Sequence, residues 1–264
     1  MEILVCIKQV PGTNKVEIDP VSGVLKRDGV DSKMNPYDLY ALESALRLRE
    51  QVGGKITVIT MGPGQATEII REAYAMGADH GILVSDRKFA GADVLATSYT
   101  LSQAIKTAGH FDIIFCGKQT TDGDTAQVGS EISEFLGIPS ATNVTAIHEA
   151  GEESITVEMG LSNTVETVEI RLPCLLCVDK GIYQPRLPSY IKKKLTQDRE
   201  ITVLSLADLP DQSTARYGLS GSPTQVQRIF SPDVNDDQQL WDGNAEELSQ
   251  RLADLLIGQK FVRR

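Results

Sequence analysis

The stretch Cys116–Gly129 has the composition of a phosphate-binding loop, because it combines glycines, hydroxyls and amides between an apolar run and a helical pattern. The free N–H groups of a helix N-terminus bind anions, and Gly117 and Gly123 would let the backbone approach a ligand. The side chains that could bond phosphate or ribose are Thr120, Thr121, Thr125 and Gln127. The hypothesis is a nucleotide diphosphate cradle. An ordinary loop in which Asp124 caps the helix is equally consistent, and the stretch is neither a P-loop nor a dinucleotide fingerprint.

Two weaker candidates precede this stretch. Asn35-Pro36-Tyr37-Asp38 joins an amide and a carboxylate at a helix start, and composition alone favours simple capping with proline at the first helical position. Thr60–Gly64 is a strand end followed by a glycine-rich turn, which composition favours as an ordinary strand–helix connection.

The cysteines and histidines predict no metal site. Cys174 and Cys177 have the C-x-x-C spacing but lie in an apolar, strand-like run, in which positions three apart face opposite ways. Cys6 and Cys116 also lie in apolar runs, so we expect four buried, reduced thiols. The three histidines are His80, His110 and His148, and none has a second ligand at metal spacing.

The elements that must position these residues alternate along the first two thirds of the chain. Apolar runs of strand length occur at Ile3–Ile7, Ile56–Ile59, Ile82–Val84 and Ile113–Cys116. Helical spacing follows each of them, near residues 36–46, 69–76, 94–109 and 128–136. This order predicts an α/β fold with a parallel sheet between two helical layers. Ligands bind such sheets at the carboxyl ends of strands, which points to the loops 8–13, 60–65 and 117–125.

The pattern changes after residue 141. Ile155–Glu158 and Val165–Ile170 alternate as in antiparallel strands added at a sheet edge, and Cys174–Val178 is typical of a central strand. Residues 208–244 are poor in apolar side chains and are expected to form an extended arm, followed by an amphipathic helix at Leu248–Leu256. We therefore expect an α/β domain over 1–190, and over 191–264 a docking stretch, an arm and a C-terminal helix.

Composition excludes several classes of function. The chain has 264 residues, 41% hydrophobic, and a net charge of −10, which argues against nucleic-acid binding. The basic run Lys192–Lys194 is either a solvated face or a docking patch. Apolar stretches are too short for a membrane span or signal peptide, so we expect a cytoplasmic protein.

These segments together resemble the β subunit of electron transfer flavoproteins, over nearly the whole chain. The motifs that carry the resemblance are Val5–Pro11, Met34–Asp38, Ala75–Asp79, Gly117–Val128, Val165–Pro173 and Pro185–Pro188. The resemblance implies a heterodimer with an α subunit and a Rossmann-like domain similar to the adenine nucleotide alpha hydrolases. It also implies a nucleotide site, with the arm and C-terminal helix wrapping the α subunit. By residue match the cofactor-binding residues are Cys6, Lys8, Asn35, Pro36, Tyr37, Asp38, Met61, Gly117, Lys118, Gln119, Thr120, Thr121, Asp122, Gly123, Asp124, Thr125, Ala126, Gln127 and Val128.

The small residues Gly123 and Ala126 and the opening Lys8–Pro11 are similar to the electron-bifurcating members. That similarity implies FAD in this subunit, which accepts hydride from NADH. One electron passes to ferredoxin or flavodoxin, and the other to the α-subunit FAD and a flavin-dependent dehydrogenase, of the lactate or acyl-CoA type. The flavin does the chemistry, so no catalytic residue is expected. A conventional carrier with structural AMP and a stand-alone nucleotide-binding protein of the stress-protein type are the alternatives, and the long tail argues against the second. Ser189–Leu195 departs from the family's longer docking loop, which weakens the expectation of an acyl-CoA dehydrogenase, and Tyr217–Gln227 resembles bifurcating members.

Overall fold

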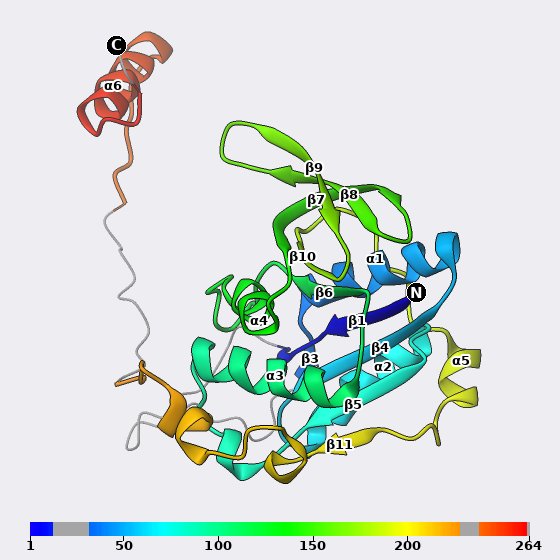
Figure 1. Ribbon diagram of the computed structural model, residues 1–264. Helices are drawn as coiled ribbons and strands as arrows, with labels where there is room; N and C mark the ends of the chain where they lie inside the picture. The colour runs from blue at the N-terminus through cyan, green and yellow to red at the C-terminus, as the bar shows by residue number, and fades with distance from the viewer. Residues whose placement is uncertain (13–31, 228–237, 263–264) are drawn as a thin grey trace. The chain divides into compact units, whose positions relative to one another are not determined.

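The computed structural model describes residues 1–12, 32–227 and 238–262 (Figure 1). Contacts within the chain define two compact units, Met1–Gln227 and Arg228–Arg264. The sequence instead predicted an α/β domain over 1–190 and a partner-contacting segment over 191–264. That this second segment contacts a partner stays a prediction. Two of the expected features lie partly outside the described residues. Residue 13 of the loop 8–13 and residues 228–237 of the arm 208–244 are not described.

The first unit is built on a nine-stranded sheet whose order is β11-β5-β4-β1-β6-β10-β7-β8-β9. Its strands are β1 (Glu2–Cys6), β4 (Lys55–Met61), β5 (His80–Val84), β6 (Ile113–Gly117), β7 (Ser140–Ala150), β8 (Ser154–Gly160), β9 (Val165–Arg171), β10 (Cys174–Val178) and β11 (Thr202–Leu204). Neighbours from β11 to β7 are parallel. β8 and β9 are antiparallel additions. A separate antiparallel pair joins β2 (Gln9–Pro11) and β3 (Ser32–Met34). The predicted α/β sheet with an antiparallel edge is confirmed.

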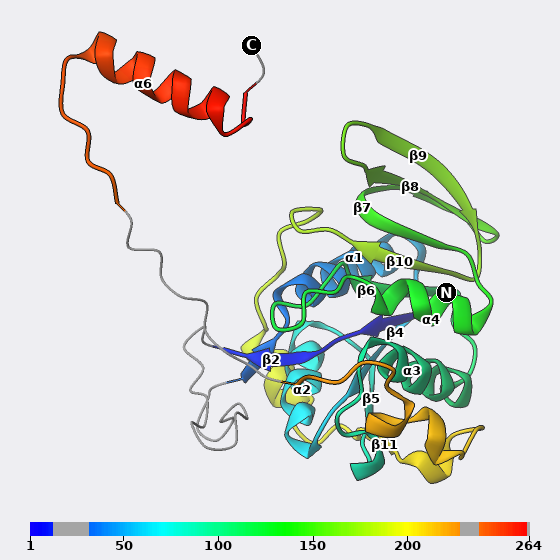
Figure 2. The same cartoon turned by 90° about the vertical axis from the view of Figure 1, so that its left-hand side faces the viewer.

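Helices cover both faces of the sheet (Figures 1 and 2). They are α1 (Pro36–Val52), α2 (Thr67–Met76), α3 (Val94–Ala108), α4 (Val128–Leu136) and the short α5 (Tyr190–Leu195). Alternate residues of β1 separate two cores: Ile3 and Val5 pack with α1 and α2, while Leu4 packs with α3. Burial on both faces explains why these strands are continuous apolar runs.

β10 confirms the expectation of a central strand. All five of its residues are buried, and it lies between β6 and β7. The long strand β7 was not predicted, because its polar positions hide the pattern: Thr142, Asn143 and Thr145 interrupt the apolar residues. β7 links the parallel part of the sheet to the β8–β9 hairpin.

Residues 202–222 belong to the first unit and pack against its sheet and helices, which differs from the expected arm. β11 pairs with β5, and short 3-10 turns follow at Leu206–Asp208, Thr214–Arg216 and Gly218–Gly221. Tyr217 is fully buried, with its ring 5.5 Å from those of Phe89 and Tyr99. Leu204, Leu206 and Leu209 are buried in the same core, and the low average hydrophobicity of the stretch did not reveal these few contacts.

The second unit contains α6 (Ala245–Gly258), which confirms the predicted C-terminal helix. Asn244 caps it by accepting hydrogen bonds from the amides of Glu246 and Glu247. No described residue of α6 is buried, and Leu252 and Leu255 are exposed. Among the described residues no helix is long and apolar enough to cross a bilayer.

Candidate functional site

The predicted loops meet where the order of the parallel strands reverses. The chain passes from β1 to β4 and β5 on one side, and β6 then returns to the other side of β1. Crevices at such a reversal are the usual ligand sites of α/β sheets. Lys8 follows β1 and Lys118 follows β6, so the crevice between these strand ends is formed by two of the predicted segments.

The buried carboxylate of Asp38 joins three segments at this crevice. One oxygen accepts a hydrogen bond from the Lys8 amide at 2.7 Å, and the other accepts from Asn35 Nδ2 at 2.9 Å. Burial raises the pKa of Asp38 from 3.8 to about 7, against the lowering effect of Asn35, the Lys8 and Gly117 amides and the Lys8 charge. Asp38 therefore holds the loop after β1 and the end of β6 in place next to the start of α1. In the chain itself this predicted cofactor-binding residue has a structural role.

Asn35 does not cap α1 with its side chain, so the simple capping interpretation is wrong. Its Nδ2 also donates to the Gln119 carbonyl at 2.9 Å, and its Oδ1 accepts from the Thr121 amide at 3.2 Å. Pro36 does occupy the start of the helix, as expected. The side chain that the sequence suggested as a cap thus binds the loop after β6 instead.

Gly117 permits the close packing of β6 against the start of α1. A Cβ built at Gly117 would lie 2.5 Å from Asp38 Oδ1 and 2.7 Å from the backbone of Tyr37. Packing within the chain does not require a glycine at position 123, since the nearest neighbour of a Cβ built there, Thr120 Oγ1, is 3.4 Å away. The expectation that Gly123 lets the backbone approach a ligand stays a prediction.

The end of the loop differs from the expected Asp124–Thr125 cap. α4 begins at Val128, and its first helical bond runs from the Glu131 amide to the Gln127 carbonyl. Asp124 and Ala126 adopt left-handed conformations with φ of 53° and 56°. Amides 128–130 precede the first helical bond, and such amides of an α-helix are free to bind an anion.

Two lysines and two carboxylates surround the loop. Lys8 Nζ lies 2.8 Å from Asp122 Oδ1, and Lys118 Nζ lies 2.9 Å from Asp179 Oδ2. Partial burial alone would raise the pKa of Asp122, but the hydrogen bond and charge from Lys8 hold it below its usual value. Asp179 was missed by the sequence analysis, because its role depends on β10 lying next to β6.

The remaining predicted residues lie around this framework rather than in it. Cys6 ends β1, and Met61 ends β4 on the face that α3 covers. Val128 packs against the same core. Hydrogen bonds between side chains and loop atoms connect Lys8, Asn35, Asp38, Gln119, Thr121, Asp122 and Asp124. Pro36, Tyr37, Gly117, Lys118, Thr120, Gly123, Thr125, Ala126 and Gln127 are neighbours of these along the chain.

The donor set fits a nucleotide. Thr60 lies in β4 near its carboxyl end, and its hydroxyl is buried without a hydrogen-bond partner in the described part of the chain. This hydroxyl is covered by the protein, so the donors open to a phosphate are the amides before α4 and the ammonium group of Lys8. The described residues contain no group of His, Cys, Asp and Glu that could hold a metal ion.

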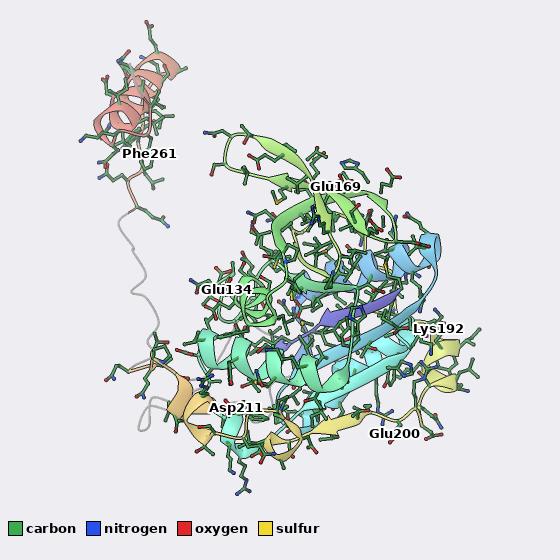
Figure 3. The ribbon with its side chains drawn as sticks, in the orientation of Figure 1. Glu134, Glu169, Lys192, Glu200, Asp211 and Phe261 are labelled. Carbon is green, nitrogen blue, oxygen red and sulfur yellow. The ribbon has the colours of Figure 1, made fainter. Side chains whose placement is uncertain are left out.

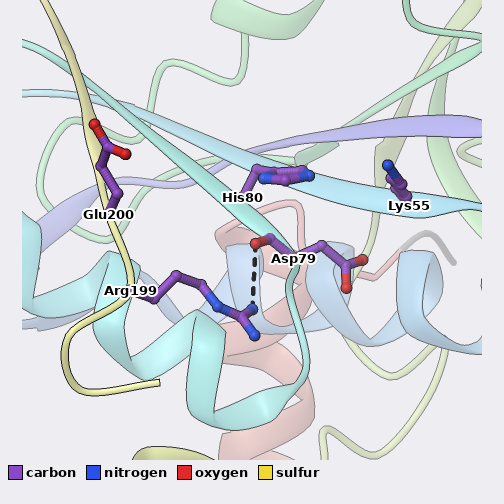
Figure 4. A pocket seen from close by; sticks show the side chains of 5 residues that line it. All are labelled: Lys55, Asp79, His80, Arg199 and Glu200. Carbon is purple, nitrogen blue, oxygen red and sulfur yellow. Dashed lines mark hydrogen bonds between the residues drawn. The ribbon is translucent and has the colours of Figure 1, made fainter. Parts of the chain in front are cut away.

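A second hollow lies elsewhere, around the amino ends of β4 and β5 (Figure 4). It is lined by Lys55, Asp79, His80, Arg199 and Glu200. Arg199 donates to the backbone carbonyls of Ala78 and Asp79, and the Asp79 carboxylate accepts from Arg49 at 3.0 Å. The side chains of Arg199 and Asp79 are therefore used to hold this end of the sheet together.

The order of the parallel strands and the helices on both faces of the sheet define an α/β protein of the doubly wound class. The family model for the electron transfer flavoprotein domain matches residues 22–209, and the chain belongs to this family. It is 47% identical over 264 residues to the electron transfer flavoprotein subunit beta of Thermoanaerobacterium thermosaccharolyticum, covering 99% of this chain and 100% of the relative.

Two further relatives carry other names. The chain is 46% identical over 233 residues to the caffeyl-CoA reductase-Etf complex subunit CarD of Acetobacterium woodii, covering 88% of each. It is 40% identical over 269 residues to protein FixA of Azorhizobium caulinodans, covering 100% of this chain and 95% of that protein. The predicted resemblance to the β subunits is confirmed. Membership implies a redox role in a complex with an α subunit, and association with flavin or AMP.

Proposed function

We propose that this chain is the β subunit of an electron-bifurcating electron transfer flavoprotein, with FAD bound at the crevice between β1 and β6. The observation that carries the proposal is the junction at Asp38 and Asn35, which holds the loop after β6 against the start of α1. Similarity to a subunit of a caffeyl-CoA reductase-Etf complex supports a partner dehydrogenase.

FAD bound here would accept hydride from NADH and pass one electron to ferredoxin or flavodoxin and one to the α-subunit FAD. The residues of this chain would bind and orient it. The amides before α4 would bind the pyrophosphate, Thr120 and Thr121 would bond phosphate or ribose, and Lys8 would supply positive charge. Small residues at Gly123 and Ala126 would leave space above the loop.

The first test is the flavin and AMP content of the complex co-purified with the α subunit, after acid extraction and chromatography. Two FAD per heterodimer without AMP supports the proposal and justifies an NADH-dependent ferredoxin reduction assay. One FAD with one AMP contradicts it and identifies a conventional carrier.

A matched pair of glycine variants tests the location of the site. Gly117→Ala places a methyl group against Asp38 Oδ1 and the Tyr37 backbone, so we expect the β-subunit nucleotide to be lost. Gly123→Ala lies in the same loop, with its closest neighbour 3.4 Å away, and should keep the nucleotide. Both variants should still co-purify with the α subunit. Retention of the nucleotide in Gly117→Ala would place the site elsewhere.

A surface around α5 is proposed to contact the partner dehydrogenase. Leu187, Tyr190, Ile191 and Leu195 are exposed, and α5 has no buried residue. Ser189 caps α5, and Lys192 of this helix, labelled in Figure 3, donates to the Met76 carbonyl at 3.3 Å. Leu195→Ser should lower electron transfer to the dehydrogenase without changing the flavin content, and an unchanged rate would remove this surface from consideration.

The second unit is proposed to bind the α subunit, because α6 exposes apolar residues that its own unit does not cover. A chain ending at Gln227 keeps the whole first unit, including residues 202–222. We expect this truncated chain to fold but not to co-purify with the α subunit. Co-purification in normal yield would refute this role.

A further inference from the structure

Three cysteines lie side by side at the carboxyl ends of neighbouring strands. Cys6 of β1 is the register partner of Cys116 of β6, and Cys116 is the register partner of Cys177 of β10. Neighbouring strands are about 4.8 Å apart. This spacing falls in the range of about 4.4–6.8 Å between the Cα atoms of cysteines that form disulfides.

The three side chains also share a face. Cys6, Cys116 and Cys177 belong to the core that α3 and α4 cover, whereas Cys174 belongs to the core under α1 and α2. Register and alternation therefore bring three of the four thiols together and exclude the fourth. The neighbouring thiols of Cys177 and Cys6, together with burial, raise the pKa of Cys116.

Access to this thiol row is from one end. Cys6 is half-buried, while Cys116 and Cys177 are each only 5% exposed. At the other end, α4 closes the row: a Cβ built at Gly129 would lie 2.3 Å from Cys177 Sγ. A small oxidant therefore meets Cys6 first, and the nearest second thiol is Cys116.

We propose that Cys6 and Cys116 form a site of reversible oxidation by hydrogen peroxide. The Cys6 thiolate attacks one peroxide oxygen, the O–O bond breaks, and the departing hydroxide takes up a proton to become water. The resulting sulfenic acid is attacked by the Cys116 sulfur, the S–O bond breaks, and a second water leaves. In balance, two thiols and one hydrogen peroxide give one disulfide and two waters, and a dithiol reductant reverses the change.

The position of the pair gives the reaction a consequence. Cys6 lies two residues before Lys8, and Cys116 directly precedes Gly117, so the disulfide would tie together the two strands that border the crevice. Capture of the sulfenic acid by Cys116 also keeps Cys6 from irreversible oxidation to the sulfinic and sulfonic acids.

The test uses the complex co-purified with the α subunit. It is treated with a few equivalents of hydrogen peroxide, alkylated under denaturing conditions and mapped by peptide mass spectrometry, with and without dithiothreitol. We expect a dithiothreitol-sensitive Cys6–Cys116 peptide as the main disulfide of this chain. Unreacted thiols, a Cys116–Cys177 link, or Cys6 found mainly as sulfinic acid would each overturn the proposal.

Two variants sharpen the result. Cys116→Ser removes the resolving thiol, so Cys6 should be over-oxidised several-fold more than in the wild type. Cys174→Ser is the matched control, because Cys174 lies on the opposite face and should leave the Cys6–Cys116 yield unchanged. Equal over-oxidation of Cys6 in the wild type and in Cys116→Ser would contradict the assignment, and the wild-type map decides the case if a variant does not fold.

Discussion

Replacement of Asp38 by asparagine should change how stability depends on pH. Burial raises the pKa of Asp38 in the folded protein from 3.8 to about 7. One pKa unit corresponds to about 1.4 kcal/mol, so ionising this carboxyl costs the folded state roughly 4 kcal/mol. Because the folded-state pKa is raised, the stabilisation is fully present below about pH 4 and is lost as the pH rises through about 7. Between pH 5 and pH 8 the expected loss is roughly 2.5 kcal/mol.

Asp38→Asn does not titrate, so this part of the slope should disappear. At pH 5 the variant should be less stable than the wild type by about 1–3 kcal/mol, because its single carbonyl oxygen cannot accept from all the donors that face the carboxyl group. This difference should shrink or reverse by pH 8, since only the wild type loses stability as the pH rises. The measurement is urea unfolding of both complexes in steps from pH 5 to pH 8. Both contain the same partner, whose own pH dependence cancels in the difference.

Asp122→Asn is the matched control. The pKa of Asp122 is lowered, so its contribution is present above its unfolded pKa and is lost only as the pH falls through the lower folded-state value. This variant should therefore keep the wild-type slope between pH 5 and 8. Parallel profiles for the wild type and Asp38→Asn would refute the reasoning.

Further variants test the packing at three places in the fold. Gly129→Ala should lower stability by about 1–3 kcal/mol by overpacking against Cys177, and Cys177→Ala should restore most of the loss in thermal melting. Arg186→Ala removes two hydrogen-bond donors that lie 2.8 and 3.1 Å from the Glu43 carboxylate. The free energy of unfolding in urea should fall by about 1.5–3 kcal/mol, and an unchanged unfolding midpoint would contradict this prediction. Asp93→Ala removes the side chain that caps α3 and that accepts hydrogen bonds from the amide and hydroxyl of Thr224. Limited proteolysis should therefore cleave the variant near residue 224 faster than the wild type, and equal cleavage rates would contradict this role.

The sequence predicted the parallel strands well, because burial on both faces leaves unbroken apolar runs such as Ile113–Cys116. It did not predict β7, whose polar positions interrupt the pattern, or the attachment of residues 202–222, whose buried side chains Leu204, Leu206, Leu209 and Tyr217 are spaced irregularly in a polar stretch. Hydrophobic periodicity is averaged over a window, so a few anchoring residues without a regular spacing are not detected.

The site shows the same limit. The residue types at 35–38 and 117–128 indicated where a ligand could bind, but the role of Asn35 depends on carbonyl and amide groups more than 80 positions away. No local rule distinguishes a helix-capping asparagine from one that bonds a distant loop. Likewise Asp179 could be paired with Lys118 only once β10 had been placed beside β6.

The place of β10 in the sheet has a consequence for the order in which the chain can assemble. β1, β4, β5 and β6 are contiguous in the sheet, so they can pair as soon as residue 117 has left the ribosome. β7, β8 and β9 are made next, but they reach the sheet only through β10, which is synthesised after them. During synthesis the segment 140–171 must wait, with its strand edges unpaired, for residues 174–178. Because exposed strand edges promote misassembly, this interval is the stage at which a nascent chain is most dependent on protection.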